Sequence, residues 1–450
     1  MNQYKHPFGH VFYRRPAHPH PMIERGEGVY LYDTEGRRYL DASGGAIVAN
    51  IGHGVREVVE AMADQAARVA YIHPTMFTSQ PLEAYAQALA EVVPLPDARF
   101  YFLCSGSEAV ETAIKLARQV QIARGEAERH LIIGRWGSYH GTTLGALAVT
   151  GKPAMRHVYV PLLRDMPHIS PPYCYRCPFG LIHPMCELRC AEALEIEIRR
   201  VGARNVAAFI AEPVSGATLG AVVPPPEYWP RVRQICDQYG LLLIADEVMT
   251  GFGRTGRWFA VEHWHVVPDI ITMGKGTTGG YFPLSITAVR GEWVETIAAQ
   301  GDFIHGGTFS HHAVGAAVGL ATLHYLQKHE LITAAARKGK LLGAKLQAAL
   351  GELACVGDIR GIGLMWGVEF MADRATKKPF PPERHFAQRI ADIAFEKGLI
   401  LYPGHGSADG VAGDHVMIAP PFIITEEQMD ELVARLAKAI SHVQMEENRN

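Results

Sequence analysis

Two residues of this chain stand where a lysine and an acid could act on one ligand. Asp246 follows the apolar run 241–245, and Lys275 follows the apolar run 270–273 and lies between two glycines. Such runs predict strands, and open α/β sheets bind ligands at the carboxyl ends of their strands. A lysine buried at that edge has a lowered pKa and attacks aldehydes. With an acid beside it, the pair meets the needs of pyridoxal phosphate, which takes a lysine at its aldehyde and an acid at its pyridinium nitrogen.

Three further segments carry groups that suit the same ligand. Ser105 and Glu108 fit a capping box, and Gly106 at that helix start lets backbone approach a phosphate closely. Tyr139 could stack on a flat ring, and the glycine-rich stretch 306–308 could give a second phosphate contact. Each has a plainer explanation as well, since S-x-x-E is usually only a cap, an aromatic residue at a strand end is usually core, and a glycine-rich stretch is usually a loop.

One competing motif is excluded. The stretch 274–277, Gly-Lys-Gly-Thr, resembles the end of a nucleotide-binding P-loop. The first glycine of that motif would fall at position 269, where the chain has Asp269, and the lysine follows its strand without a phosphate loop. The lysine is therefore not expected to bind a nucleotide.

The region from about residue 99 to residue 290 alternates between strand and helix patterns. This alternation predicts an α/β fold with a mainly parallel sheet whose faces are covered by helices. The predicted strands are 100–104, 131–134, 206–211, 241–245, 270–273 and 284–289, and the predicted helices are 108–124, 187–201, 227–239 and 293–299.

The segments on either side predict a second, smaller α+β domain. Residues 26–41 predict a hairpin or meander, and residues 359–370 predict a strand. The predicted helices outside the sheet region are 55–70, 82–93, 312–329, 331–350, 384–397 and 425–444. We expect an N-terminal arm and part of the small domain in residues 1–60. Residues 61–320 are expected to form the large cofactor-binding domain, and residues 321–450 the C-terminal small domain.

Length and composition are those of an ordinary multidomain enzyme. The chain has 450 residues, of which 48% are hydrophobic, and a net charge of -3. This balance gives no reason to expect nucleic acid or an anionic membrane as a partner. Residues 1–10 lack the apolar segment of a secretory signal, and the apolar runs are far shorter than the roughly 20 residues of a membrane span. A cytoplasmic enzyme acting on small molecules is expected.

Four of the seven cysteines lie close together in the sequence. Cys174, Cys177, Cys186 and Cys190 form C-x2-C and C-x3-C pairs, which resemble zinc-ligand spacing. The separation between the pairs is shorter than in most zinc ribbons. A structural metal is one interpretation, reduced packing or redox-labile thiols are the other, and no metal is expected in the chemistry. The histidine- and proline-rich residues 1–25 predict an extended arm rather than a metal site.

Together these motifs resemble the class III (omega) aminotransferases, which are pyridoxal-phosphate enzymes of fold type I. The resemblance covers residues 33–427. Its most specific part is the stretch 245–256, Ala-Asp-Glu-Val-Met-Thr-Gly-Phe-Gly-Arg-Thr-Gly, followed at the family distance by Met-Gly-Lys-Gly at 273–276. Gly-Ser-Glu-Ala at 106–109 and Tyr-His-Gly at 139–141 occur in the family's order.

The resemblance implies roles for individual residues. Lys275 would hold the cofactor covalently and later carry a proton, and Asp246 would pair with the pyridinium nitrogen. The other residues implied to bind the cofactor are Gly106 and Ser107 at the phosphate, Tyr139 and Val248 on the two ring faces, Glu212 near the cofactor hydroxyl, His140 beside them, and Thr308, which would reach the phosphate of the neighbouring subunit. A homodimer with shared sites is therefore implied.

The implied reaction is the transfer of an amino group from an omega-amino acid, a diamine or another amine to a 2-oxo acid (pyruvate or 2-oxoglutarate). It would follow a ping-pong mechanism, with Lys275 moving the proton. Racemase, mutase, decarboxylase and phospho-lyase reactions occur in the same family and are alternatives. A scaffold protein with an inactive fold is disfavoured because both Lys275 and Asp246 are present.

The chain departs from the family pattern where a substrate carboxylate would be bound. Tyr402 stands where many relatives have an arginine that binds this carboxylate, so the oxo acid must be recognised by another route. Arg254, Arg257 and His405 are the candidates to replace the arginine.

The opposite wall of the expected pocket differs too. Residues 46–48, Ala-Ile-Val, replace an aromatic residue seen in many relatives, which predicts a wider amine pocket. Met76 and Phe77 are candidates to line that pocket, or to be ordinary core residues.

Overall fold

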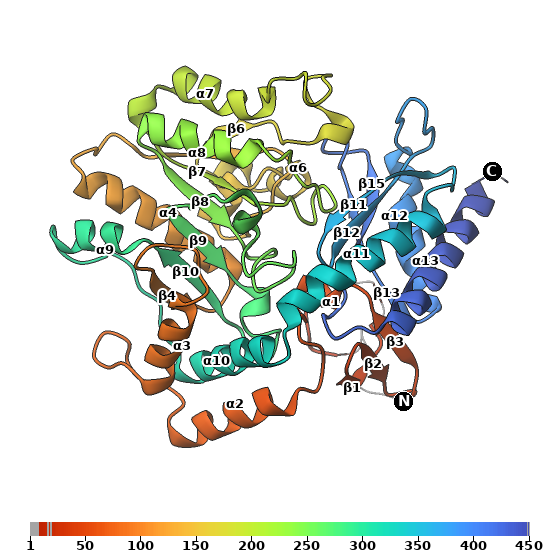
Figure 1. Cartoon of the computed structure of the whole chain (residues 1–450), viewed down its shortest axis with the longest axis horizontal. Coiled ribbons are helices and arrows are strands. Elements are labelled where there is room, and N and C mark those ends of the chain that lie inside the picture. The colour runs from red at the N-terminus through yellow and green to blue at the C-terminus, as the bar shows by residue number, and fades with distance from the viewer. Residues whose placement is uncertain (1–8, 16–17, 19, 448, 450) are drawn as a thin grey trace.

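The computed structural model describes residues 9–15, 18, 20–447 and 449, and its centre is a seven-stranded sheet (Figure 1). In spatial order the strands are β4 Arg99–Leu103, β10 Ser285–Val289, β9 Ile270–Met273, β8 Leu242–Asp246, β7 Val206–Ala211, β5 Leu131–Arg135 and β6 His168–Ile169. Only β10 runs against the others, since it pairs antiparallel with both β4 and β9. The predicted α/β fold with a mainly parallel sheet is therefore confirmed.

Helices cover both faces of this sheet. The covering helices are α4 Gly106–Ala123, α5 Leu144–Val149, α7 Arg189–Val201, α8 Tyr228–Tyr239 and α9 Gly291–Ala298. Alternate residues of a strand point to opposite faces. Accordingly, Leu242 and Ile244 of β8 pack in one apolar cluster with α4 and α5, while Leu243 packs in another with α7 and α8. Because both faces are covered, β7, β8 and β9 are buried along their whole length, as parallel strands usually are.

Each strand and helix predicted between residues 99 and 290 is present, with ends shifted by at most one or two residues. The strand β6 and the helix α6 Pro153–Arg156 were not predicted because each is too short to show a period. The helix α5 is also short and lacks a helical repeat long enough to recognise.

Two smaller sheets lie at one end of the molecule, where the red N-terminal and blue C-terminal segments meet in Figure 1. One is β1 Ile23–Glu27, β2 Tyr30–Asp33, β3 Arg38–Asp41 and β13 Leu399–Ile400, and the other is β11 Val356–Ile362, β12 Met365–Phe370, β15 Asp414–Ile418 and β14 Tyr402–His405. The parallel pairing of β3 with β13 joins the two ends of the chain. The helices beside them are α11 Leu331–Leu350, α12 Phe386–Glu396 and α13 Glu426–Glu447.

One predicted element is wrong in form. The stretch 359–370 was expected to be a single strand, but it contributes to an antiparallel hairpin of β11 and β12. The chain reverses at Gly363, which has φ +56° and lies where a side chain would collide with the backbone of Thr255. Glycine adopts this left-handed conformation at low cost. An apolar run carries no mark of such a reversal except the glycine itself.

The remaining helices are α1 Gly44–Ile47, α2 Arg56–Arg68, α3 Gln80–Ala90 and α10 Ala313–Lys328, of which α2 and α3 pack against α10. In the arm, residues 9–15, 18 and 20 form neither helix nor strand. None of the helices in the described part of the chain is long and apolar enough to cross a membrane.

Candidate active site

Lys275 lies directly beyond the carboxyl end of β9. Its backbone is left-handed, with φ +48°, which costs a residue other than glycine about 1–2 kcal/mol. The Asn50 side chain fixes this turn by donating to the carbonyls of Gly276 (3.2 Å) and Phe252 (3.3 Å). The Lys275 amine has no hydrogen bond among the described residues. Burial lowers the pKa of Lys275 to about 8, although the charges of Asp246 and Glu212 oppose this shift, so a neutral, nucleophilic amine is accessible near neutral pH.

Asp246 is the last residue of β8, the strand next to β9, and is almost fully buried. His140 Nδ1 lies 2.6 Å from Asp246 Oδ2, and this contact makes Nδ1 the donor to the carboxylate. The Thr272 hydroxyl (3.0 Å) and the Val248 amide (3.1 Å) donate to Asp246 Oδ1. These donors give both oxygens of the buried carboxylate a partner, which matters because a buried polar group without a hydrogen bond is costly.

The first turn of α4 faces the same place. Ser105 Oγ accepts from the Glu108 amide (3.3 Å), and Glu108 Oε2 accepts from the Ser105 amide (2.7 Å), so the predicted capping box is formed. A side chain at Gly106 would lie 2.9 Å from Val248 Cγ1, so only glycine lets this helix start approach so closely. The free amides at the start of a helix attract phosphate.

Tyr139 and Glu212 form another part of the wall. Glu212 Oε2 accepts from the Tyr139 amide (3.4 Å), and Glu212 Oε1 accepts from the Gly216 amide (3.1 Å). Burial raises the pKa of Glu212 and also that of Tyr139. Tyr139 follows β5, and Glu212 follows β7, so both side chains come from carboxyl ends of neighbouring parallel strands.

These groups line one cavity of about 160 Å³. Its lining residues are Gly106, Ser107, Tyr139, His140, Gly141, Glu212, Asp246, Val248, Met249 and Lys275. The structure thus brings together every residue that the sequence analysis assigned to the cofactor except Thr308. That residue is exposed, in the loop before α10, and is not part of this cavity.

Thr272 and Met249 also lie at this site, and neither was predicted from the sequence. Thr272 is paired in register with Asp246 across β8 and β9, which explains its hydrogen bond to the carboxylate. This contact depends on strand register, which the sequence does not state. Met249 follows Val248 in the family motif, and only its neighbour was assigned a role.

The three candidates for carboxylate binding lie in different surroundings. Arg254 is buried, and its Nη1 donates to the carbonyls of Leu364 (3.0 Å) and Pro420 (2.7 Å). Arg257 is exposed and lines neither the cofactor cavity nor the cavity that contains His405. His405 lies in a separate cavity of about 440 Å³ next to the cofactor cavity.

The residues expected to line a wider amine pocket are Ile47, with its neighbours at 46 and 48, and Met76 and Phe77. Ile47 is buried and has φ +63°, which is unusual for a β-branched residue. Met76 and Phe77 are 70% and 63% exposed, so neither is an ordinary core residue of this chain.

The four clustered cysteines are free thiols that line one small pocket together with His183. Cys174 is exposed and Cys190 is buried. Within the described ranges, no group of three or more histidine, cysteine, aspartate or glutamate side chains is arranged to hold a metal ion.

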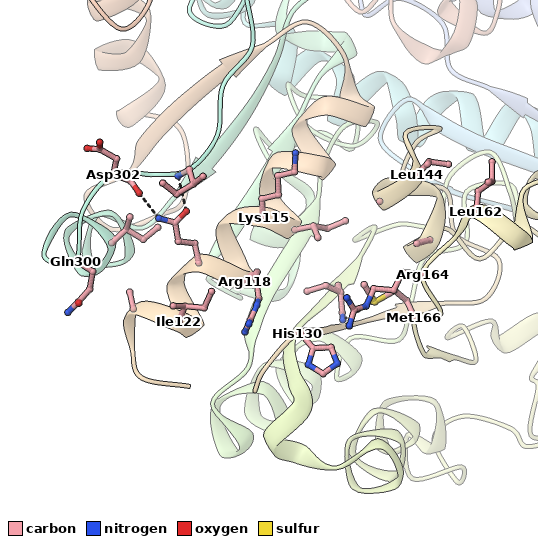
Figure 2. Close-up of a pocket in the computed structure, with 18 residues that line it drawn as sticks. Lys115, Arg118, Ile122, His130, Leu144, Leu162, Arg164, Met166, Gln300 and Asp302 are labelled. Atoms are coloured by element: carbon pink, nitrogen blue, oxygen red, sulfur yellow. Dashed lines mark hydrogen bonds between the residues drawn. The ribbon is translucent and has the colours of Figure 1, made fainter. Parts of the chain in front are cut away.

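A larger cavity lies elsewhere in the molecule. Its volume is about 790 Å³. Figure 2 shows its lining, which includes Lys115 and Arg118 of α4 as well as His130 and Arg164. Gln119 closes one side: its Nε2 donates to the Asp302 carbonyl (2.6 Å), and its Oε1 accepts from the Ile304 amide (2.9 Å). None of the residues assigned to the cofactor lines this cavity. The predicted cofactor residues thus line a smaller cavity than this one.

The cofactor cavity fits pyridoxal phosphate by its own chemistry. It offers a buried lysine amine without a hydrogen bond, a buried carboxylate held by donors, and the free start of a long helix. The sequence model of the family described as "Aminotransferase class-III" matches residues 12–440.

The chain belongs to the class III aminotransferases. The YodT protein of Bacillus subtilis (strain 168), described as an uncharacterized aminotransferase, is 41% identical over 426 residues, which cover 94% of this chain and 96% of that protein. The putrescine–pyruvate aminotransferase of Pseudomonas aeruginosa is 34% identical over 93% of this chain and 90% of its own length. A crystal structure of a thermostable (S)-enantioselective omega-transaminase from Thermomicrobium roseum superposes with TM-score 0.89 at 39% identity, covering 96% of both chains.

These comparisons also establish the fold and the cofactor. The class III aminotransferase has fold type I, as the resemblance implied. Its cofactor is pyridoxal 5'-phosphate, and its activity is that of a transaminase.

Proposed function

We propose that this aminotransferase moves an amino group from a diamine, an omega-amino acid or another amine to a 2-oxo acid such as pyruvate or 2-oxoglutarate. The proposal is supported by the similarity to a putrescine–pyruvate aminotransferase and to a diaminobutyrate–2-oxoglutarate transaminase. The observation that carries it is the buried Lys275 amine in the cavity whose wall includes Asp246.

Different residues of the cavity would bind different parts of the cofactor. The amides of Gly106 and Ser107 would bind its phosphate at the start of α4. Asp246, oriented by His140, would bind the ring nitrogen, and the carboxylate would keep that nitrogen protonated. Tyr139, Val248 and Glu212 are proposed for the two ring faces and the ring hydroxyl.

The chemistry then depends on the proton that Lys275 carries. When bound, pyridoxal phosphate supplies an electron sink for the carbon that loses its proton. Lys275 Nζ, as a neutral amine, would take that proton from the substrate carbon and hold it until it is returned. The pKa of about 8 leaves a useful fraction of this amine neutral near pH 7. The oxo acid then reacts in the reverse order, which gives ping-pong kinetics.

We also propose a homodimer in which Thr308 reaches the phosphate site of the partner. Support comes from apolar side chains exposed around this loop. Phe309 is 58% exposed and Ile304 is 79% exposed. The centroids of the Tyr71 and Phe309 rings are 6.2 Å apart. Exposed apolar groups in this number favour a covered surface.

The same proposal includes a cytoplasmic location and the domain division into residues 1–60, 61–320 and 321–450. A net charge of -3 is consistent with small-molecule substrates rather than nucleic acid or a membrane surface. The division is supported by the separate sheets, because the seven-stranded sheet uses only strands between residues 99 and 289.

A half-reaction tests the proposed activity. Alanine, β-alanine, 4-aminobutyrate, putrescine and taurine are added one at a time to the holoenzyme without oxo acid, and the cofactor absorbance is followed. Conversion of the cofactor to its amine form by a diamine or an omega-amino acid is the expected result. If the cofactor is bound but none of these amines converts it, the proposed donor class is wrong.

A further inference from the structure

We propose that the cavity of about 440 Å³ next to the cofactor site binds a carboxylate of the oxo acid, and that Lys152, assisted by His405 and Arg14, is the cation that binds it. This inference rests on the proposed function, because it assumes an oxo acid as the second substrate. It answers the question raised by Tyr402, which occupies the place of the expected arginine.

Lys152 is tied directly to the turn that carries Tyr139 and His140. The His140 amide donates to the Thr150 hydroxyl (2.9 Å), and the Gly137 amide donates to the Gly151 carbonyl (2.9 Å). Lys152 therefore follows a backbone segment that lies against one wall of the cofactor cavity. Lys152 lines the neighbouring cavity together with Trp136, Gly137 and Thr218, so this cavity adjoins the same turn from its other side.

The charge of Lys152 has no protein partner. Across the part of the chain that the structure describes, no carboxylate forms an ion pair or hydrogen bond with it. Burial lowers the pKa of Lys152, and the neighbouring charge of Arg14 lowers it further. A half-buried cation without a counterion is costly unless a ligand supplies the negative charge.

Two other basic residues lie in the same region and come from distant parts of the sequence, although the lowered pKa of His405 leaves its ring mostly neutral near pH 7, so that it can donate a hydrogen bond but brings little charge. The pKa of His405, across the cavity, is lowered by burial and then by the charge of Lys152. Arg14, in the N-terminal arm, acts on the pKa values of both Lys152 and Tyr139. Arg14 does not itself line the cavity of about 440 Å³ that Lys152, Arg176 and His405 line (the cation-lined cavity), but its charge acts on both Lys152 and Tyr139.

Two further features suit a carboxylate. The Ser407 hydroxyl is buried in the wall of this cavity and has no hydrogen-bond partner among the described residues. The acid in the lining, Asp409, is exposed and already accepts from the amides of Val411 (2.8 Å) and Ala412 (2.7 Å). Arg176, on the far wall, is paired with Glu369 at 2.6 Å. Lys152 is therefore the cation left to bind an anion.

Tyr402 lies near Tyr139. Tyr402 contributes to the raised pKa of Tyr139, after the larger effect of burial, so the two rings lie near each other at the cofactor cavity. The site that binds the carboxylate has thus moved from the start of β14 to the segment between α5 and α6, with help from the arm.

The test separates the two half-reactions. Lys152→Met removes the charge with little change in volume, Lys152→Arg keeps the charge, and Lys340→Met removes the charge of an exposed lysine elsewhere as a matched control. Each holoenzyme is assayed in the half-reaction with putrescine, which has no carboxylate, and in the half-reaction of its amine form with pyruvate and with 2-oxoglutarate. Inhibition by succinate, an unreactive dicarboxylate, is measured in parallel.

We expect Lys152→Met to raise the KM for the oxo acid and the inhibition constant of succinate by about tenfold or more, as loss of a charged hydrogen bond does. The putrescine half-reaction should stay within about twofold, and Lys152→Arg and Lys340→Met should resemble the wild type. An unchanged KM for both oxo acids in Lys152→Met would overturn the inference. An equal loss with putrescine would overturn it as well, because the lysine would then serve the cofactor site in general.

His405→Asn and Arg14→Gln provide a second set of variants if Lys152→Met does not fold. Each should raise the KM for the oxo acid and leave the putrescine half-reaction unchanged, and no change in either variant would again contradict the inference. If the wild-type enzyme transfers nitrogen to neither oxo acid, the proposed function fails instead. The two failures are therefore distinguishable.

Discussion

The cofactor cavity is walled by the ends of β8 and β9 and by the start of α4, whereas the cation-lined cavity beside it is walled mostly by connecting segments. Sheet hydrogen bonds hold the first set of groups, as the register of Asp246 opposite Thr272 illustrates. The second set comes mostly from loops. A rigid element suits groups that every substrate needs, and loops suit groups that distinguish one substrate from another.

This difference leads to a direct expectation. Substitutions in the cofactor cavity should slow both half-reactions together, because both depend on the same bound cofactor. Substitutions in the cation-lined cavity should affect the oxo acid alone. Four effects are expected at the cofactor cavity, from the largest to the smallest.

Lys275→Ala should cause the largest loss. Without its amine, the protein neither attaches the cofactor covalently nor carries the proton, so both half-reactions should fall by at least about 10^4-fold. Absorbance of the cofactor and rates with putrescine and pyruvate measure this. If the variant keeps activity within tenfold of the wild type, Lys275 has no essential part in the mechanism, and the proposed difference between the two cavities is wrong.

Asp246→Asn should slow both half-reactions by about 10^3-fold, because a neutral amide does not keep the ring nitrogen protonated. Single-turnover rates measure the effect. Asp269→Asn is the matched control at the other end of β9, where Asp269 binds Arg233 (2.7 Å) and the Leu243 amide (2.8 Å). It should lower the melting temperature and leave the single-turnover rate within about threefold. A mild loss in Asp246→Asn would mean that another group protonates the ring.

The rate of covalent cofactor attachment should depend on pH through Lys275. Only the neutral amine attacks the aldehyde, so below a pKa of about 8 the rate should fall about tenfold for each unit of pH, and above it the rate should level off. Mixing cofactor-free protein with pyridoxal phosphate between pH 6 and pH 10 tests this by absorbance. A rate that still climbs at pH 10 would indicate an ordinary, solvated lysine.

Gly106→Ala should weaken cofactor binding by about tenfold, because its new methyl group would meet Val248 Cγ1 at 2.9 Å and push it from its place. Equilibrium dialysis of pyridoxal phosphate gives the dissociation constants. The double variant with Val248→Ala should lose less than the sum of the two single losses, since the shorter side chain relieves the collision. Strict additivity would show that the close approach of α4 to Val248 does not matter for binding.

The cofactor cavity could largely be assembled from the sequence because each of its walls follows an apolar run. The strand ends before Asp246 and Lys275 and the cap at Ser105 are local signals, and the parallel sheet brings them to one edge. The cation-lined cavity could not be assembled, since Lys152 and His405 belong to segments without periodicity that only the folded chain brings together. His405 was named as one of three candidates, and nothing in the sequence ranked it above Arg254.

The hairpin of β11 and β12 was missed for a related reason. An apolar run shows that a strand is present but not where it reverses, and Gly363 is one glycine among several in that run. The burial of Arg254 was equally hidden, because its two carbonyl partners, Leu364 and Pro420, lie far along the chain.

The attachment site of the cofactor tests the central claim most directly. The holoenzyme is treated with borohydride, which fixes the cofactor to the amine that holds it, and the digested protein is mapped by peptide mass spectrometry. The account predicts a single cofactor-modified peptide, with the added mass on Lys275. Modification of a different lysine, Lys152 included, with Lys275 left unmodified would contradict it.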